Sequence, residues 1–411
     1  MKDSGVEWIG DIPEVWTTFR IKYNTYLKGR IGWQGLKSSE FIDEGPYLVT
    51  GTDFKNGRVN WNTAYHISMD RYNEAPEIQL KVGDLLITKD GTVGKLAFID
   101  YLPDKASLNS HLVVVRPTTQ KYSNKYLYWV LSSDVFTIYT ELTQDGTIMA
   151  SLSQEKLNNF SFPLPPSNKQ NRIVSFLDTK CSLIDTTIEK EREVIDKLKE
   201  YRQAVITEAV TKGIRPGVPM KDSDVEWIGA IPEEWEVCKI KYLARMQSGD
   251  TISSEIINDD GEYPVYGGNG LRGYTSSFTH SGSYILIGRQ GALCGNVHVV
   301  NGNFWPSEHA IVVYELGKSN QKWLAYILFS MNLNQYSTSA AQPGLAKEKI
   351  RDLFVCLPPF SEQQEIASFL DAKCSGIDAT IQKRELAIEK LTQYKQSLIY
   401  ECVTGKREVL T

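Results

Sequence analysis

The chain has 411 residues, of which 41% are hydrophobic and 23% are charged, a composition typical of a soluble globular protein with two to three domains. No apolar run approaches the roughly 20 residues that span a bilayer, and the N-terminus lacks a signal-peptide core, so we expect a cytoplasmic protein with no membrane partner. The formal net charge of −5 argues against a protein that binds nucleic acid alone through a broad basic surface.

The first segment, VEWIGDIPEVW at residues 6–16, recurs as VEWIGAIPEEW at 225–235, with nine of eleven positions identical and an offset of 219 residues. Its paired tryptophans predict packing rather than chemistry. We expect an apolar staple that fastens the start of each variable region, with Pro13 or Pro232 setting the turn. The staple residues are Trp8, Ile12, Trp16, Trp227, Ile231 and Trp235.

Two variable regions follow these phrases, at residues 17–160 and 236–355. Both are rich in Gly, Asn, Tyr and Trp, and their short apolar runs are bounded by turn residues, as in DLLITKDG, LVVVRP, SYILIGRQG and AIVVYE. A helical pattern comes later in each region, NKYLYWVLSSDVF at 124–136 and QKWLAYILFSMN at 321–332. These patterns predict two globular, β-rich mixed α/β (α+β) domains with much loop.

A repeated helical segment follows each variable region. LPPSNKQNRIVSFLDTKCSLIDTTIEK at 164–190 resembles LPPFSEQQEIASFLDAKCSGIDATIQK at 357–383 with an offset of 193, so the first copy carries 26 more residues between its repeated ends. Ser167 and Ser361 are the expected N-caps. The apolar seam of the helices consists of Leu177, Cys181, Ile184, Ile188, Ile195, Leu198, Val205, Leu370, Cys374, Ile377, Ile381, Ile388, Leu391 and Leu398.

This seam recurs every three or four residues, which predicts a long amphipathic helix in each copy. About 40 residues at 1.5 Å per residue would make a rod of roughly 60 Å. The stripe could pack inside one domain, but two equal rods would then lack partners, which favours an antiparallel coiled coil between them. The expected fold is pseudo-twofold symmetric. Its parts are an N-terminal domain (1–162), a first helical region (163–213), a linker with the second domain (214–356) and a second helical region (357–411).

Some short motifs resemble cofactor-binding or catalytic motifs, but the residues around them do not fit such sites. GGNGLRG at 267–273 contains G-x-G-x-x-G, but a β-like stretch follows where a dinucleotide site needs a helix. DGTVGK at 90–95 lacks the first glycine and the Ser/Thr of a phosphate loop. The six cysteines and five histidines have no spacing typical of a disulfide framework or metal site. We therefore expect no metal, no cofactor and no catalytic residue in this chain.

Several phrases together resemble the specificity subunits of type I restriction–modification systems. They are the two Trp-rich phrases, YPVYGGNGLRGYTSSF, YILIGRQGALCGNV, AQPGLAKEKIRDLFVCLPPFSEQQEIASFLD and EYRQAVITEAVTKGI, and they cover nearly the whole chain, twice over. One departure is Lys169-Gln170, where the second copy has the family's acidic residue in Glu362-Gln363. The resemblance therefore implies that the first helix docks slightly differently at its start.

The resemblance implies that each variable region is a target recognition domain for one half of a bipartite, asymmetric sequence in double-stranded DNA. The antiparallel helices would set the spacer between the halves and dock two methyltransferase subunits, through which restriction subunits join. S-adenosylmethionine, ATP and Mg²⁺ are expected on those partner subunits. The chain would be a non-catalytic part of a bacterial defence complex that methylates adenine and cuts DNA.

A sequence-specific DNA reader needs polar side chains on loops that reach base edges. TKDGTVGK and NSH in the first region correspond to GRQG and SEH in the second, where GGNGLRGY adds a further loop. Taken singly, each residue is explained at least as well as a solvated turn or a strand-end residue, so the prediction rests on the matching loops. The candidates are Lys89, Thr92, Lys95, Asn109, Ser110, His111, Asn269, Arg272, Arg289, Gln290, Ser307, Glu308 and His309.

The charge balance refines this expectation. Residues 236–355 contain ten Lys/Arg and ten Asp/Glu, so counterion release by this chain alone would be modest and we expect weak DNA binding without partners. Two rival functions stay open at this point. A scaffold that pairs proteins through its coiled coil leaves the two diverged domains without a role. A single-chain restriction–methylation enzyme would need motifs that the sequence lacks.

Overall fold

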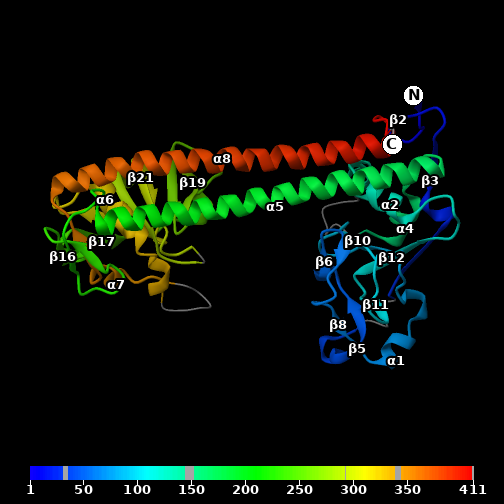
Figure 1. Ribbon diagram of the computed structural model, residues 1–411, viewed down its shortest axis with the longest axis horizontal. Helices are drawn as coiled ribbons and strands as arrows, with labels where there is room; N and C mark the ends of the chain where they lie inside the picture. Colours follow the sequence, from blue (N-terminus) through cyan, green and yellow to red (C-terminus); the bar gives the residue numbers. More distant parts are fainter. Residues whose placement is uncertain (31–35, 144–151, 292, 338–343, 410–411) are drawn as a thin grey trace. The chain divides into compact units, whose positions relative to one another are not determined.

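The computed structural model describes residues 1–30, 36–143, 152–291, 293–337 and 344–409. The chain forms two units: unit 1 contains Met1–Lys190 and Leu386–Thr411, and unit 2 contains Glu191–Glu385 (Figure 1). Each unit holds a sheet-rich region and part of two long helices, α5 (Ser167–Lys212) and α8 (Phe360–Thr404). The division of the chain into four parts at residues 162, 213 and 356 stays a prediction.

Unit 1 is built on a six-stranded sheet with the order β4-β12-β9-β10-β7-β6, accompanied by a three-stranded sheet with the order β11-β5-β8. The strands of unit 1 are β1 (Lys2–Asp3), β2 (Asp11–Ile12), β3 (Thr17–Arg20), β4 (Thr25–Gly29), β5 (Ile42–Val49), β6 (Phe54–Lys55), β7 (Arg58–Val59), β8 (Tyr65–His66), β9 (Leu85–Thr88), β10 (Leu96–Phe98), β11 (Ala106–Leu108), β12 (Leu112–Pro117) and β13 (Ser161–Leu164).

The centre of this sheet is the antiparallel pair β9 and β12, in which Val113 lies opposite Ile87. Successive side chains of a strand face opposite sides of a sheet. Leu85 and Ile87 accordingly join the main core of unit 1, whereas Leu86 joins a second core. Because both faces are covered, these strands are continuous apolar runs rather than alternating ones.

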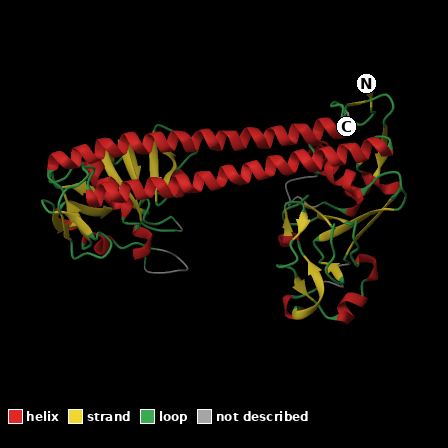
Figure 2. Ribbon diagram, in the orientation of Figure 1, coloured by secondary structure: helices red, strands yellow, loops and turns green. Residues whose placement is uncertain are grey.

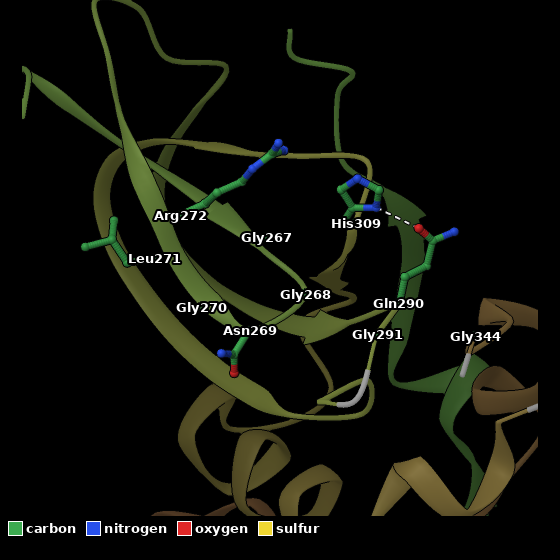
Figure 3. Close-up of a pocket in the computed structure, with 10 residues that line it drawn as sticks. All are labelled: Gly267, Gly268, Asn269, Gly270, Leu271, Arg272, Gln290, Gly291, His309 and Gly344. Carbon is green, nitrogen blue, oxygen red and sulfur yellow. Dashed lines mark hydrogen bonds between the residues drawn. The ribbon is translucent and has the colours of Figure 1, made fainter. Parts of the chain in front are cut away.

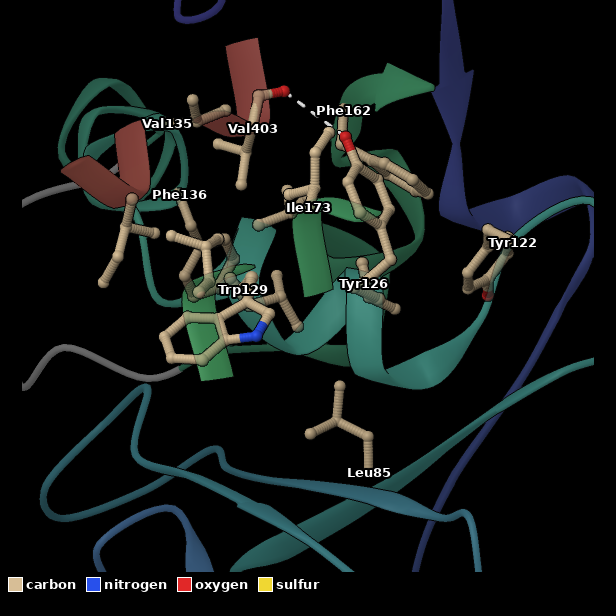
Figure 4. Close-up of a cluster of buried hydrophobic side chains, with 14 of the residues drawn as sticks. Leu85, Tyr122, Tyr126, Trp129, Val135, Phe136, Phe162, Ile173 and Val403 are labelled. Carbon is tan, nitrogen blue, oxygen red and sulfur yellow. Dashed lines mark hydrogen bonds between the residues drawn. The ribbon is translucent and has the colours of Figure 1, made fainter. Parts of the chain in front are cut away.

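Helices cover one face of this sheet and connect it to α5 and α8. They are α2 (Asn124–Leu131), α3 (Asp134–Leu142) and α4 (Gln154–Asn159), whereas α1 (Met69–Asn73) packs against β5 of the three-stranded sheet. Figure 4 shows Tyr126 of α2 among the buried side chains of this core. Its hydroxyl donates to the carbonyl oxygens of Pro163 at 2.9 Å and Val403 at 3.3 Å. Complete burial raises the pKa of Tyr126 well above its usual value, so this hydroxyl stays a donor and ties α2 to α8.

Unit 2 has one six-stranded sheet with the order β17-β22-β20-β21-β18-β19. Figure 2 draws the strands of both units in yellow and the long helices in red. Its centre is again an antiparallel pair of apolar runs, β20 and β22, with Ile287 opposite Ile311. The elements of unit 2 are β14 (Met220–Asp222), β15 (Ala230–Pro232), β16 (Glu236–Lys239), β17 (Ala244–Ser248), β18 (Tyr263–Gly267), β19 (Gly270–Thr275), β20 (His280–Gly288), β21 (Val297–Pro306), β22 (Ala310–Glu315), β23 (Phe354–Leu357), α6 (Gln321–Ser330) and α7 (Lys347–Arg351).

The two long helices run antiparallel inside each unit, because partners further along α5 lie earlier along α8. In unit 1, Lys395 Nζ lies 2.6 Å from Asp185 Oδ1 and Lys169 Nζ donates to the carbonyl of Val409 at 3.2 Å. In unit 2, Arg384 pairs with Glu191 at 2.6 Å and Arg202 with Asp378 at 3.1 Å. The expected mixed fold, with two sheet-rich domains and long antiparallel helices, is confirmed.

Two local predictions need correction. The helical pattern at 124–136 is split between α2 and α3, with Ser132 as the C-cap of α2 and Ser133 as the N-cap of α3. Ser167 and Ser361 were the expected N-caps of the long helices, but they lie inside α5 and α8. The carbonyl of Pro166 already accepts from the backbone of Gln170 at 3.1 Å, so the helix begins directly after Pro-Pro.

Candidate nucleic-acid interface

In unit 1, the loop after β9 meets the short segment that precedes β12. The backbone N–H of Lys89 donates to the carbonyl of His111 at 2.9 Å. The Nδ1 atom of His111 lies 3.4 Å from Oδ2 of Asp90. The structure therefore brings together the two loops that the sequence placed about 20 residues apart, and it adds Asp90, which was not among the predicted residues.

The side chains in this part of unit 1 are open to solvent to different degrees. Thr92, Lys95 and His111 are exposed, whereas Lys89, Asn109 and Ser110 are partly buried. Asn109 has a structural role, since its Oδ1 accepts from the backbone of His111 at 3.1 Å. Thr92, Lys95 and His111 are therefore the predicted DNA-contacting residues of unit 1 whose side chains are open to solvent.

A buried arginine holds the strand end from which one of these loops begins. Arg30, directly after β4, donates from Nε to the carbonyl of Leu108 at 3.0 Å and from Nη2 to the hydroxyl of Ser107 at 3.1 Å. Burial lowers the pKa of Arg30 from its usual value, although an arginine stays charged because that value is so high. These bonds fix the end of β11, from which the segment 109–111 begins.

Unit 2 repeats the backbone arrangement with different side chains. The N–H of Arg289 donates to the carbonyl of His309 at 2.9 Å, as Lys89 does to His111. The carbonyl of Arg289 accepts from the N–H of Leu345 at 2.9 Å, and the carbonyl of Lys89 accepts from Leu152 at 2.9 Å. In each unit, three segments distant in sequence are therefore joined by the same main-chain bonds.

A third loop adds a hollow to this part of unit 2. The turn between β18 and β19 brings up the glycine-rich segment 267–270, which with the β20 loop encloses about 660 Å³ (Figure 3). Four predicted residues line this hollow, namely Asn269, Arg272, Gln290 and His309. The rejected G-x-G-x-x-G motif is thus a hairpin turn rather than a dinucleotide site, since no helix follows it.

Glycines let the loops of this hollow approach each other closely. A Cβ on Gly268 would lie 2.7 Å from the carbonyl oxygen of Gln290, inside van der Waals contact. A Cβ on Gly288 would strike the carbonyl oxygen of Gly268. The third segment comes from Gly344, whose backbone pairs with Gln290 in an antiparallel bridge.

Two of the predicted residues in unit 2 do not line the hollow. The guanidinium of Arg289 donates from Nη1 to the hydroxyl of Ser248 at 3.1 Å. Ser307 is fully buried, and its Oγ has no hydrogen-bond partner in the described part of the chain. Sequence position alone did not distinguish these inward side chains from Gln290 and His309.

The staple residues fasten the start of each sheet-rich region to its end. β3 pairs with β13 in unit 1, and β16 pairs with β23 in unit 2. The indole of Trp8 donates to the carbonyl of Ser161 at 2.9 Å, and that of Trp227 donates to Phe354 at 3.1 Å. Both acceptors are the first residues of the closing strands. Ile12, Trp16, Ile231 and Trp235 are buried in the two main cores.

The predicted seam residues of α5 and α8 are buried or partly buried, and several of them join the main cores of units 1 and 2. Ten of them are buried: Leu177, Cys181, Ile184, Ile188, Ile195, Leu370, Cys374, Ile377, Ile381 and Leu398. Leu198, Val205, Ile388 and Leu391 are partly buried. In the described part of the chain, no helix is long and apolar enough to cross a membrane, and no group of three or more His, Cys, Asp or Glu residues could hold a metal ion.

Comparisons with known proteins agree with this architecture. The family model of the type I restriction modification DNA specificity domain matches residues 31–200 and 232–390. The EcoprrI specificity subunit of Escherichia coli is 44% identical over 133 residues, which are 31% of this chain and 33% of that protein. The EcoBI specificity subunit, also from Escherichia coli, is 24% identical over 409 residues, covering 90% of this chain and 82% of that protein.

A solved structure also shares the fold. It concerns complex assembly and conformational transition of the type I R-M system, and one of its chains superposes with a TM-score of 0.72 at 16% identity, covering 97% of this chain and 100% of the other. The family model alone spans most of the sequence, including both sheet-rich regions. This chain belongs to the family of specificity subunits of type I restriction–modification systems.

Proposed function

We propose that each unit reads one half of a bipartite, asymmetric sequence in double-stranded DNA. The two long helices would set the spacer between the halves and dock two methyltransferase subunits, through which restriction subunits join the complex. Catalysis, and with it S-adenosylmethionine, ATP and Mg²⁺, would belong to those partners. This chain would supply the sequence specificity of the complex.

The observation that carries this proposal is the repeated loop scaffold. Lys89 and Arg289 make the same two main-chain bonds, to His111 and Leu152 in unit 1 and to His309 and Leu345 in unit 2. Main-chain bonds do not depend on side-chain identity, so the scaffold can present different side chains at the same places. Two such scaffolds with different side chains suit a target whose halves differ in sequence.

The outer faces of the helices support the docking part of the proposal. In unit 1, Leu183, Leu386 and Tyr394 are 62%, 49% and 49% exposed, and in unit 2 Tyr201 is 54% exposed. These large side chains lie outside the α5–α8 seam. Exposed apolar and aromatic residues on a helix already packed along another face are typical of an interaction surface.

The balance of charge favours partners that help to hold the DNA. The variable region of unit 2, residues 236–355, has ten Lys/Arg and ten Asp/Glu. Phosphate neutralisation by this unit alone would be small. We expect the isolated chain to bind DNA weakly and the methyltransferase subunits to clamp the duplex. Tight, specific binding by the isolated chain at physiological salt would contradict this part of the proposal.

Mapping methylated adenines across the genome of a host with and without this chain tests the proposal. The expected result is a motif with two separated, unequal halves that is methylated only when the chain is present, and a continuous palindrome would contradict it. Co-purification should also yield two methyltransferase subunits per chain. A methylation assay with the isolated chain should show no activity, and activity there would identify it as an enzyme.

A further inference from the structure

Gln290 is the exposed polar side chain of the β20 loop that lines the hollow of unit 2 (Figure 3). Its backbone is held on two sides, by the bridge to Gly344 and by the bond between the neighbouring Arg289 and His309. A side chain on such a fixed backbone can present its amide at a defined place. The amide of glutamine has one donor end and one acceptor end.

A chain of hydrogen-bonding groups leads from the backbone to this amide. Oε2 of Glu308 accepts from the N–H of Ile252 at 3.3 Å. Oε1 of Glu308 lies 3.1 Å from Nε2 of His309, and Nδ1 of His309 lies 2.7 Å from Oε1 of Gln290. An amide oxygen only accepts hydrogen bonds, so Nδ1–H of His309 is the donor to Gln290 in this arrangement.

These groups, called here the Glu308–His309 relay, determine which end of the Gln290 amide points away from the ring. A glutamine amide can usually turn over and exchange its oxygen with its NH₂ group at little cost, which would exchange a donor for an acceptor at the base edge. In unit 2, the oxygen is engaged by His309, and the NH₂ group extends on the other side (Figure 3). The oxygen keeps a second lone pair, so Gln290 offers one donor and one acceptor side by side.

We propose that Gln290 selects adenine at one position of the half-site read by unit 2, and that His309 is the positioning residue that fixes the orientation of its amide. This inference rests on the proposed function. In the major groove adenine offers the N7 acceptor and the N6 donor, which match the amide. Guanine offers two acceptors, N7 and O6, and O6 would face the amide oxygen.

Unit 1 provides a matched contrast at the same position. The residue after Lys89 is Asp90, whose carboxylate lies 3.4 Å from Nδ1 of His111. A carboxylate only accepts hydrogen bonds, so Asp90 lacks the donor that N7 of adenine requires. Cytosine, which presents the N4 donor, suits such an acceptor. The two units therefore differ in a predictable way at one loop position.

Selection from a duplex library tests the inference. The full chain, bound to its methyltransferase subunits, is incubated with duplexes that carry two randomised half-sites, and the bound duplexes are sequenced. In Gln290→Glu the NH₂ group is replaced by an oxygen without a change of shape. We expect the preference for adenine at one position of one half to fall by about 5- to 150-fold, with the other half unchanged.

Variants of His309 separate positioning from folding. In His309→Phe an aromatic ring stays but the hydrogen bond to Gln290 and the contact with Glu308 are lost, so the discrimination between adenine and guanine at that position should weaken. His309→Asn keeps a donor near the place of Nδ1 and should recover most of the preference. Equal selectivity of the two variants would overturn the positioning role. The thermal unfolding midpoint, measured for each variant, shows whether the chain is folded.

The matched control is Asp90→Asn in unit 1, which should change the opposite half only. If a folded Gln290→Glu chain selects the same two halves as the natural one, the inference is wrong and the proposed function stands. If the natural chain selects no bipartite sequence at all, the proposed function itself fails. These two outcomes are distinct in the same experiment.

Discussion

The loops after β9 in unit 1 and after β20 in unit 2 make the same main-chain hydrogen bonds but carry different side chains. In unit 1 the side chain of Thr88 closes its own loop, because its hydroxyl accepts from the N–H of Lys95 at 2.9 Å and donates to the carbonyl of Thr92. In unit 2 the same place is Gly288, since the turn at Gly268 leaves no room for a side chain. Unit 2 thus lacks this local side-chain bond and gains a third loop beside the hollow.

The arginines near these loops show a similar exchange. In unit 1, Arg30 follows the edge strand β4 and donates toward the end of β11 at Leu108. In unit 2, the corresponding position after β17 is Gly249. There the arginine is in the loop, and Arg289 donates to Ser248 at the end of the edge strand. In each unit one arginine joins the edge strand to the loops that we propose to read DNA. The difference is in the position of that arginine. In unit 1 it is Arg30, outside the loop that holds Lys89, and in unit 2 it is Arg289, within the loop itself.

The largest effect is expected for Trp235→Ala in unit 2. Trp235 is 1% exposed and its indole donates to Oε2 of Glu362 at 3.0 Å. Its removal leaves a large cavity and should cost about 3–5 kcal/mol of stability, measured by urea unfolding, without changing the sequence that the surviving complex methylates. A changed motif at unchanged stability would contradict the structural role.

The matching tryptophan of unit 1 sharpens the comparison. Trp16 is 4% exposed, but Lys169 occupies the place of Glu362, with its Nζ 3.7 Å from Oε1 of Glu408. We expect Trp235→Phe to cost about 1 kcal/mol more than Trp16→Phe, because only the former removes an indole donor from a carboxylate. Equal costs would show that the exchange of Glu for Lys has no energetic consequence.

A smaller effect is expected for Gly288→Ala. The added methyl group would strike the carbonyl of Gly268 and displace the β18–β19 turn. We expect a loss of about 1–3 kcal/mol in the free energy of unfolding, typical of overpacking, together with weaker selection of one half of the target. Thr88→Ala is the control in unit 1, and its effect on selection should be confined to the other half. Gly288→Ala chains with natural stability and selection would show that the loops need no close approach.

The smallest effect concerns the cysteines, which are buried in both units except for the partly buried Cys238. Burial raises the pKa of Cys181 and of Cys356 to about 12, and that of Cys402 to about 11. Because the thiolate is the reactive form, at pH 8 only about one thiol in 10,000 is reactive at a pKa of 12. Alkylation of the folded chain followed by mass spectrometry should leave these three unmodified, and partly buried Cys238 should react first. The unfolded chain is the control, and rapid labelling of folded Cys181 would contradict the packing of the seam.

Much of the architecture follows from local patterns. The repeated apolar spacing from Leu177 to Leu198 specifies α5, and runs such as LVVVRP specify strands that are buried on both faces. The loops that we predict to read DNA follow those strands, because turn residues come after them. The sequence did not show which of their side chains are exposed: Ser307 is buried and Arg289 donates to Ser248. The direction of a side chain depends on neighbours distant in sequence.

The sequence by itself determined that this protein is a duplicated pair of sheet-rich domains with two amphipathic helices, because repeats, helical periodicity and apolar runs are properties of neighbouring residues. Only the tertiary structure decided which loops meet. The bonds from Lys89 to Leu152 and from Arg289 to Leu345 join segments more than 50 residues apart, and the relay through Glu308 and His309 exists only once these segments are packed. Long-range strand pairing brings them together, and no local pattern encodes it.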